Sequence, residues 1–329
     1  MLAKEQKTHF ESKGFLVIEN LIAQEVLECV RSEYAKLVDD LYATWYRDGL
    51  VAIAPEGLSF WDKLDQGYAN QLDVHQPLTI CLPHGDVRSD SPMHMGPAIF
   101  DLIRHERILD VVQDLIGPEI TASPIQHVRI KPPQSAARSD ELRAHVVATG
   151  WHQDKGVTLA EANETTMVTV WVAITDATLE NGCLQVAKSG PTNDLLPHCC
   201  RKQVEIIDEY LPAAENIQPT PVKAGGAVIF HPLTPHASRP DLSDEYRWSF
   251  DLRYNISGQP TGRSQFPEIV VRSSSDPSSE VADWRDLKAM WDDTRAQLAT
   301  TPVPLSAPLG RLEPLLRLMG DCRHRSLSA

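Results

Sequence analysis

The sequence predicts a mainly β protein with flanking helices, in which a helical first third precedes an antiparallel sandwich or barrel. Apolar residues recur at helical spacing in the first third, whereas short segments rich in Val, Ile, Thr and aromatic residues follow from about residue 119. Strands and helices do not alternate in this later part. That order favours an antiparallel architecture over a doubly wound parallel sheet.

The first third contains one strand candidate and two long helix candidates. Residues 14–20, "GFLVIEN", form a short apolar run typical of a strand. Residues 23–46 and 96–117 each carry apolar side chains at helical spacing. The second of these segments closes on Gly117, a residue type that often ends helices, so we expect one continuous helix there.

Five strand candidates follow, separated by turn-forming clusters. They are "EITASPIQHVRIKPP", "MVTVWVAITDA", "GCLQVAK", "PVKAGGAVIFHP" and "RWSFDLRYNI". A late amphipathic helix is predicted over 282–300, after a loop rich in Ser and Pro. We therefore expect a single domain over 1–329. It comprises a mostly helical part (1–118), a β core (119–257) and a C-terminal helical extension with a tail (258–329).

Composition limits the classes of partner. A formal net charge of -14 argues against a nucleic-acid surface and against docking on anionic lipid. No apolar stretch reaches the length of a signal peptide or of a membrane span. None of the six cysteines stands in a C-x-x-C pair, so we expect a reduced, cytoplasmic protein. A small molecule is the expected partner, and no protein partner is implied.

Two His-x-Asp triplets raise the question of a metal site, and a His-x-Glu triplet at residues 9–11 is a weaker candidate. On an extended chain, residues two apart lie on the same side, so His152 and Asp154 in "TGWHQDKGV" can bind one ion. The same holds for His84 and Asp86, although Pro83 and Gly85 favour a polar turn there. Such triplets arise by chance, so the surrounding sequence must decide.

A second histidine cluster, "FHPLTPHASRP", follows the first triplet. Two His and one carboxylate occupy one face of an octahedral ion and leave three positions open, as in non-haem Fe(II) oxygenases. Arg247, on the next strand candidate, has the planar fork that holds a carboxylate of a co-substrate. His231 in this cluster is expected to be a core residue, and one distal His completes the set.

Four blocks together resemble the phytanoyl-CoA dioxygenase family of Fe(II)/2-oxoglutarate oxygenases, most strongly over 126–256. "WHQDKG" is similar to the family's iron motif, and "WVAITDATLENGCLQV" to its W-x-A…N-G-C-L block. "GGAVIFHPLTPHAS" resembles the segment with the distal iron histidine, and "YRWSFDLRY" the strand with the 2-oxoglutarate arginine. The resemblance implies a double-stranded β-helix, a jelly roll of the cupin type.

The resemblance also implies a role for individual residues. Its iron ligands fall on His152, Asp154 and His236. The residues implied at the 2-oxoglutarate site are Arg247, Ser238 and Trp171, with Gln126 or His127 near the other end of the molecule. Gln153 and His198 are expected to face the substrate.

The implied activity is that of an Fe(II)/2-oxoglutarate-dependent dioxygenase. It would use O₂ to hydroxylate a small-molecule metabolite and release succinate and CO₂. Desaturation or cyclisation would use the same residues, and Asp154 argues against halogenation. A non-oxidative metal-binding jelly roll is the competing class, which Arg247 and Ser238 disfavour. Asp241 stands where the family usually has Asn, and nothing in the sequence indicates an acyl-CoA substrate.

Overall fold

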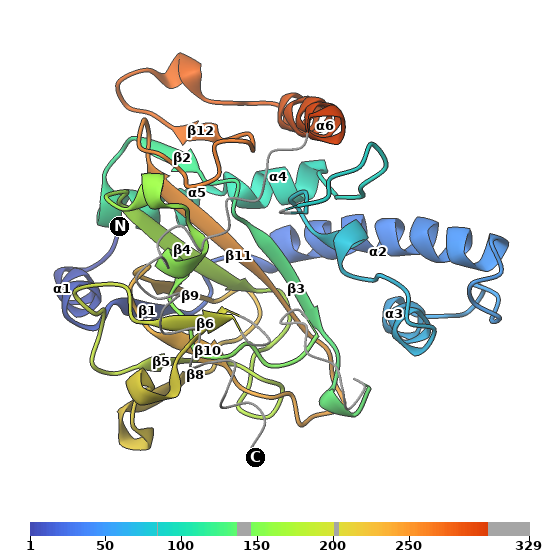
Figure 1. Cartoon of the computed structure of the whole chain (residues 1–329), viewed down its shortest axis with the longest axis horizontal. Coiled ribbons are helices and arrows are strands. Elements are labelled where there is room, and N and C mark those ends of the chain that lie inside the picture. Colours follow the sequence, from blue (N-terminus) through green and yellow to red (C-terminus); the bar gives the residue numbers. More distant parts are fainter. Residues whose placement is uncertain (84, 137–145, 201–203, 302–329) are drawn as a thin grey trace.

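Two antiparallel sheets form the centre of the molecule (Figure 1). The computed structural model describes residues 1–83, 85–136, 146–200 and 204–301. In the larger sheet, β11 pairs with β4 along one edge and with β2 and β3 along the other. In order across that sheet, the strands are β1 (Phe15–Ile18), β9 (Ala227–Phe230), β4 (Met167–Ala173), β11 (Arg247–Ile256), β2 (Ile120–Ala122) and β12 (Ile269–Arg272), and β3 (His127–Lys131) joins β11 beside β2.

The smaller sheet faces the larger one across an apolar layer. Its strands are β10 (His236–Ser238), β5 (Leu184–Ala187) and β8 (Ile217–Thr220). A separate pair is formed by β6 (His198–Cys200) and β7 (Val204–Ile206). Trp171 and Phe230 of the larger sheet share one buried cluster with Leu184 and Val186 of the smaller sheet. Two facing sheets with this buried layer make a jelly roll, as predicted.

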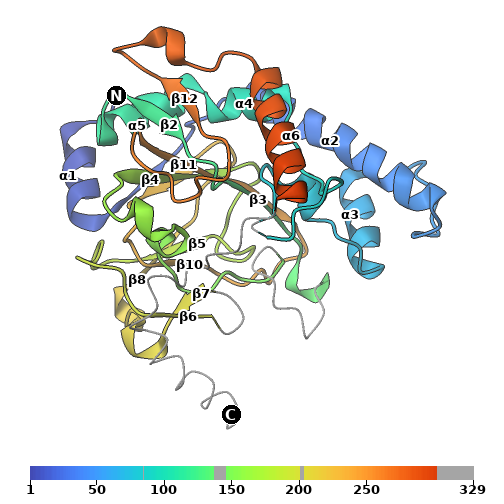
Figure 2. The same ribbon diagram turned by 45° about the horizontal axis from the view of Figure 1, so that its top comes forward.

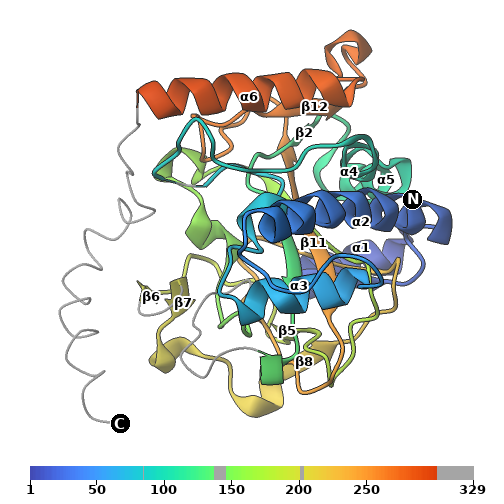
Figure 3. The ribbon, with the colours of Figure 1, turned by 90° about the vertical axis from the view of Figure 1, so that its right-hand side faces the viewer.

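The helices cover the outer face of the larger sheet. Figure 2 shows α1 and α3 at opposite ends of the molecule, and Figure 3 shows α6 next to β2 and β12. The helices are α1 (Lys4–Lys13), α2 (Gln24–Arg47), α3 (Phe60–Ala69), α4 (Pro97–Ile103), α5 (Glu106–Ile116) and α6 (Trp284–Thr300). No helix within the described residues is long and apolar enough to cross a membrane.

Helix α2 shows why these segments pack on the sheet. Its buried side chains, among them Val30, Tyr34 and Val38, recur every three or four residues and so form one stripe. The Tyr34 ring lies 5.1 Å from that of Trp248 and 5.8 Å from that of Phe250, both on β11. Removing this apolar surface from water is the main stabilising contribution to the helix–sheet layer.

The structure corrects several sequence predictions. The single helix expected over 96–117 is two helices, because His105 is extended (φ -58°, ψ 124°) and starts a new helix with its own buried face. The first long strand candidate is also divided, since Pro124 separates β2 from β3. Helix α1 buries no residue and gave no periodic signal. Helix α3 was missed, although Ser59 and Asp62 form a capping box.

The termini of the chain contribute to the same sheet. Strand β1 comes from the part predicted to be mostly helical, and it pairs with β9. Strand β12 comes from the C-terminal extension, and it pairs with β2. The division of the chain at residues 118 and 257 stays a prediction, with these two strands lying outside the predicted β core.

Candidate metal centre

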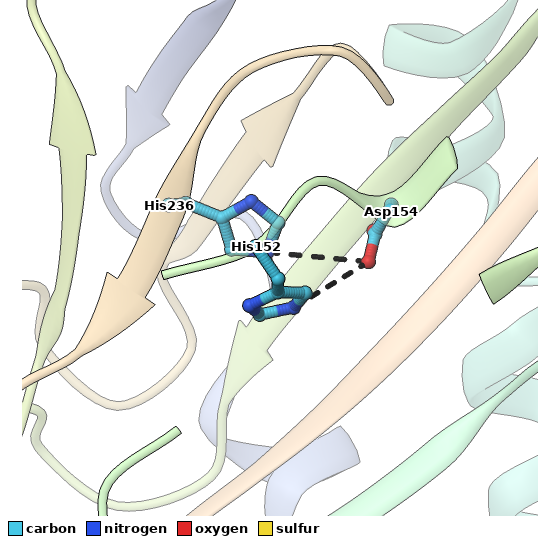
Figure 4. A group of neighbouring side chains, drawn as sticks. All are labelled: His152, Asp154 and His236. Atoms are coloured by element: carbon cyan, nitrogen blue, oxygen red, sulfur yellow. Dashed lines mark ion pairs between the residues drawn. The ribbon is translucent and has the colours of Figure 1, made fainter. Parts of the chain in front are cut away.

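Three side chains from two segments converge between the sheets. His152 and His236 form an isolated antiparallel bridge, in which each backbone N–H donates to the other residue's carbonyl at 2.9 Å. Asp154 starts a short 3-10 turn two residues later. Its Oδ1 lies 3.9 Å from His152 Nε2 and 4.0 Å from His236 Nε2 (Figure 4). Each residue thus offers one ligand atom, and these atoms lie within 4.8 Å of one another.

The histidine rings present a lone pair to the centre of this group. His152 Nδ1 donates to the Gly150 carbonyl at 2.8 Å, and His236 Nδ1 donates to the Thr234 carbonyl at 3.0 Å. These bonds place the proton on Nδ1 and leave Nε2 free to bind a metal. Burial lowers the pKa of both histidines, which favours the neutral ring that a metal requires.

The carboxylate of Asp154 is held by an arginine and a threonine. Arg253 Nη2 donates to Oδ1 at 2.6 Å, Arg253 Nε donates to Oδ2 at 3.1 Å, and the Thr169 hydroxyl also donates to Oδ2. Burial by itself raises the pKa of Asp154, but the Arg253 charge and the neighbouring histidines outweigh it, so this pKa lies below its usual range. Two neutral imidazoles and one ionised carboxylate are a donor set that fits Fe(II).

The triad opens into a cavity with an unusual excess of cations. The four cationic side chains come from β11 and β3, where every second residue faces the same way. The cavity is lined by Arg129, Lys131, Thr149, His152, Asp154, Trp171, Leu184, Phe230, His236, Ala237, Ser238, Arg247, Asp251 and Arg253. Two of the four cations have a carboxylate partner, since Arg253 pairs with Asp154 and Arg129 pairs with Asp251 at 3.2 Å.

Arg247 is buried, and the described part of the chain offers it no ion pair. Its guanidinium is 5.3 Å from the Trp171 ring centroid, and Nη1 donates to the Ser249 hydroxyl at 3.3 Å. Within the described residues, no carboxylate forms an ion pair with Arg247, and its Nε has no hydrogen-bond partner. Burial lowers its pKa to about 10, so it is still a cation at neutral pH. A buried cation of this kind fits the carboxylate of a ligand.

Lys131 lies beside Ser238 in the same cavity, and sequence reasoning missed it. Its Nζ donates to the Ser238 hydroxyl at 3.1 Å, to the Val147 carbonyl at 2.6 Å and to the Thr149 hydroxyl at 2.8 Å. Burial, helped by the Arg247 charge, lowers its pKa well below the usual value. The alternation of polar residues at 127, 129 and 131 was the available signal that β3 has a polar face toward the cavity.

The structure separates Gln126 from His127. Gln126 does not line the triad's cavity. It lies in a second, mainly apolar cavity together with Ile103 and Trp291. His127 starts β3 on the same face as Arg129, and its Nδ1 is 4.0 Å from Cys81 Sγ. Of the two alternatives, the strand geometry thus favours His127 as the residue on the cavity side, although neither lines the cavity itself.

Gln153 and His198 form hydrogen bonds with the loops beside His152, and their expected position facing the substrate stays a prediction. The Gln153 amide donates to Thr192 Oγ1 at 2.7 Å and to the Leu233 carbonyl at 2.8 Å, and its oxygen accepts from Leu196 N at 2.7 Å. His198 Nε2 accepts from the backbone N–H of Gln153 at 3.2 Å. Neither residue lines the cavity, since these hydrogen bonds turn both side chains toward these loops.

The other histidine candidates are not at the centre. His9 and Glu11 lie on α1, where residues two apart do not face each other. His84 lies outside the described residues. His231 is half-buried and accepts from Leu233 N at 3.2 Å, which agrees with the expectation that it is not a ligand.

Comparison with known proteins agrees with this geometry. The family model for phytanoyl-CoA dioxygenase matches residues 10–249. A probable phytanoyl-CoA dioxygenase of Caenorhabditis elegans is 22% identical over 311 residues, which cover 87% of this chain and 91% of that protein. The peroxisomal phytanoyl-CoA dioxygenase of Rattus norvegicus is 24% identical over 267 residues, 78% of this chain and 69% of the relative.

Solved structures show the same fold. The apo form of ThoJ, a non-heme monooxygenase, has a TM-score of 0.57 at 18% identity and covers 90% of this chain and 99% of its own. EvdO2 from Micromonospora carbonacea var. aurantiaca has a TM-score of 0.52 at 19% identity, with 78% of this chain and 91% of its own covered. Because the family model matches most of the chain, a span that includes the His152, Asp154 and His236 group, the chain belongs to the phytanoyl-CoA dioxygenase family and is a non-haem iron, 2-oxoglutarate-dependent oxygenase.

Proposed function

We propose that this enzyme hydroxylates a small-molecule metabolite, with His152, Asp154 and His236 as its iron ligands. The observation that carries the proposal is the cavity itself, which combines a triad of neutral imidazoles and an ionised carboxylate with an unpaired buried arginine. When bound, iron and 2-oxoglutarate supply the oxidising power that removes a hydrogen atom from the substrate and inserts oxygen, with succinate and CO₂ as co-products.

The chain's own residues bind and orient the co-substrate. Arg247 would bind the distal carboxylate of 2-oxoglutarate through its two-nitrogen fork, and its guanidinium lies over the Trp171 ring. Ser238 would add a hydroxyl at the same end, and Lys131 orients this hydroxyl by donating to its oxygen at 3.1 Å. His152 and His236 keep their Nδ1 protons on backbone carbonyls, so the rings need no tautomer change to bind metal.

Water exclusion follows from burial of the cavity floor. Arg247, Ser249 and Arg253 are each at most 3% exposed. Removing water strengthens the attraction between Arg247 and a carboxylate, because the effective dielectric constant falls. Desaturation or cyclisation would use the same groups, and the substrate's position then decides which product forms.

A non-oxidative metal-binding role is the alternative. It accounts for the triad, but it gives no reason for a buried arginine that forms no ion pair with any carboxylate whose position the structure describes. Two measurements separate the roles: anaerobic titration of the Fe(II)-loaded protein with 2-oxoglutarate, and succinate release in the presence of O₂ and a metabolite panel. The proposal requires an absorption band on titration and succinate release that one metabolite class stimulates. A protein that binds Fe(II) without either response would be a metal-binding protein only.

A cytoplasmic location stays part of this proposal. The described cysteines Cys29, Cys81 and Cys183 are free thiols, which is typical of a reducing compartment. Fractionation of cells with a tagged full-length chain tests it, and recovery with an organelle would contradict it.

A further inference from the structure

The contact between Arg253 and Asp154 places a fixed positive charge against the metal-ligating carboxylate. Arg253 donates through two nitrogens, at 2.6 Å to Oδ1 and 3.1 Å to Oδ2. Its third nitrogen, Nη1, donates to the Ile125 carbonyl at 2.8 Å. The Arg253 side chain is therefore held by Asp154 on one side and by the Ile125 carbonyl on the other. Arg253 and Asp154 are almost fully buried, with 4% and 1% of their side chains exposed.

The closer of the two contacts involves the oxygen that faces the histidines. Asp154 Oδ1 is the atom 3.9 Å from His152 Nε2 and 4.0 Å from His236 Nε2. An ion bound by the three residues shares this oxygen with the guanidinium. Asp251 is the neighbouring carboxylate on the same face of β11, and it is paired with Arg129. Arg253 therefore forms its ion pair with Asp154.

A charge count shows what Arg253 changes. A histidine that keeps its proton on Nδ1 and binds through Nε2 is neutral, so the three residues contribute one negative charge, from Asp154, and Arg253 cancels it. With Fe(II) and a 2-oxoglutarate dianion in place, the cluster is neutral. Without the arginine it would carry one negative charge, and in a buried site this charge would favour the more highly charged ferric ion.

We infer that Arg253 raises the reduction potential of the bound iron and so keeps it ferrous between turnovers. A cation a few ångströms from the ion repels Fe(III) more than Fe(II), because Fe(III) carries one more positive charge. Burial preserves this effect, since salt screens buried charges weakly. Hydrogen bonds and net charge around ligands are general means of setting the potential of iron centres. The inference rests on iron binding at the triad, which belongs to the proposed function.

Thr169 provides a matched neutral control. It lies directly opposite Arg253 across the β4–β11 pairing, and its hydroxyl donates to the same carboxylate. Thr169→Val removes this hydrogen bond without any change of charge. Arg253→Lys disturbs the two-point geometry but keeps the charge, whereas Arg253→Gln removes the charge and keeps a hydrogen-bond donor.

The experiment compares these variants as full-length, iron-loaded proteins. The midpoint potential of the bound iron is measured with redox mediators, and the charge-transfer band of the Fe(II)–2-oxoglutarate complex is recorded without O₂. In Arg253→Gln, the Fe(III)/Fe(II) ratio at a given solution potential is expected to be at least tenfold higher than in the wild type. This corresponds to a midpoint potential lower by about 59 mV for one electron. Its band should move to longer wavelength, because the iron then gives up an electron more easily.

Arg253→Lys and Thr169→Val should stay close to the wild type in both readouts. Equal shifts in Arg253→Gln and Arg253→Lys would overturn the inference, since the geometry rather than the charge would then control the potential. An unchanged potential in Arg253→Gln would overturn it as well. Should Arg253→Gln not fold, Arg253→Met takes its place as the variant without the charge: a lowered potential supports the inference, and a wild-type potential overturns it. Absence of iron binding in the wild type would instead refute the proposed function.

Discussion

The two faces of β11 are both buried, yet they face different neighbours. The outward side chains, Trp248, Phe250, Leu252 and Tyr254, pack against the helical layer with Tyr34 of α2. The inward side chains, Arg247, Ser249, Asp251 and Arg253, face the metal cavity or its floor. A strand with this alternation is expected to have one dry face and one wet face. In β11 the polar face does not contact bulk solvent. It lies inside the protein and faces the cavity proposed to bind the co-substrate.

This difference separates stability from function along one strand. Burying apolar side chains stabilises the fold, whereas burying charged groups costs free energy unless they are paired. The outer face of β11 therefore contributes stability. The inner face contains a group, Arg247, that forms no ion pair with a carboxylate among the described residues, and whose Nε lacks a hydrogen-bond partner there. We therefore expect mutations on the outer face to lower the free energy of unfolding, and mutations on the inner face to lower the affinity for 2-oxoglutarate.

The largest effect is expected at the metal centre. His152→Ala removes one of three ligands and should abolish stoichiometric Fe(II) binding together with the charge-transfer band of the 2-oxoglutarate complex. Metal analysis and anaerobic absorption spectroscopy of the purified variant measure both. The fold should persist, because His152 contributes its backbone, and not its ring, to the bridge with His236.

The control for this variant is His9→Ala. His9 belongs to the other kind of histidine–carboxylate triplet in the chain, on the exposed side of α1. It should keep full iron content. Loss of iron from His9→Ala, with retention in His152→Ala, would show that the metal centre has been assigned to the wrong triplet.

The second prediction concerns the outer face. Phe250→Ala removes a fully buried ring that packs on Tyr34 and should lower the free energy of unfolding by about 3–5 kcal/mol. The 2-oxoglutarate affinity of the molecules that stay folded should be unchanged. Denaturant unfolding and anaerobic 2-oxoglutarate titration measure the two quantities. If Phe250→Ala kept the wild-type free energy of unfolding and lost much of its 2-oxoglutarate affinity, the outer face could not be assigned to stability and the inner face to binding.

The sequence predicted the elements and motifs that have a local pattern. It did not predict contacts between residues that are distant in the sequence and adjacent only in the folded protein. The strands of the core, α2 and the triad follow from periodicity and from family motifs. The Arg253–Asp154 pair joins residues 99 positions apart, so no local pattern indicates it. Lys131 was visible only as one of several polar residues on β3. No local pattern indicates that the Gln153 side chain donates to Thr192 and to the Leu233 carbonyl, which lie 39 and 80 positions further along the chain.

The third prediction tests the inner face. Arg247→Gln should weaken 2-oxoglutarate binding by about 2–5 kcal/mol, because a buried carboxylate loses its charged partner. Iron content should stay stoichiometric, and the free energy of unfolding should not fall, since no ion pair within the described residues is lost. Arg239→Gln, at a half-buried arginine that donates to the Leu179 carbonyl, is the control and should bind 2-oxoglutarate normally. Normal binding by Arg247→Gln would show that another group holds the co-substrate.

The smallest effect is expected at Ser249, which lies between the two charged ends of the inner face. Its hydroxyl accepts a hydrogen bond from Arg247 Nη1 at 3.3 Å, and the Arg247 guanidinium makes no other to a side chain or backbone that the structure describes. Ser249→Ala should leave the charge in place but allow the guanidinium to rotate, and so weaken 2-oxoglutarate binding by about 1 kcal/mol, roughly fivefold in affinity. Because this bond acts only through Arg247, the effect should disappear when Arg247 is already glutamine. A double-mutant cycle measured by anaerobic 2-oxoglutarate titration isolates this coupling. Additive losses in the double variant would mean that Ser249 contacts the co-substrate directly, and the inner face would then bind 2-oxoglutarate through two independent groups instead of one oriented arginine.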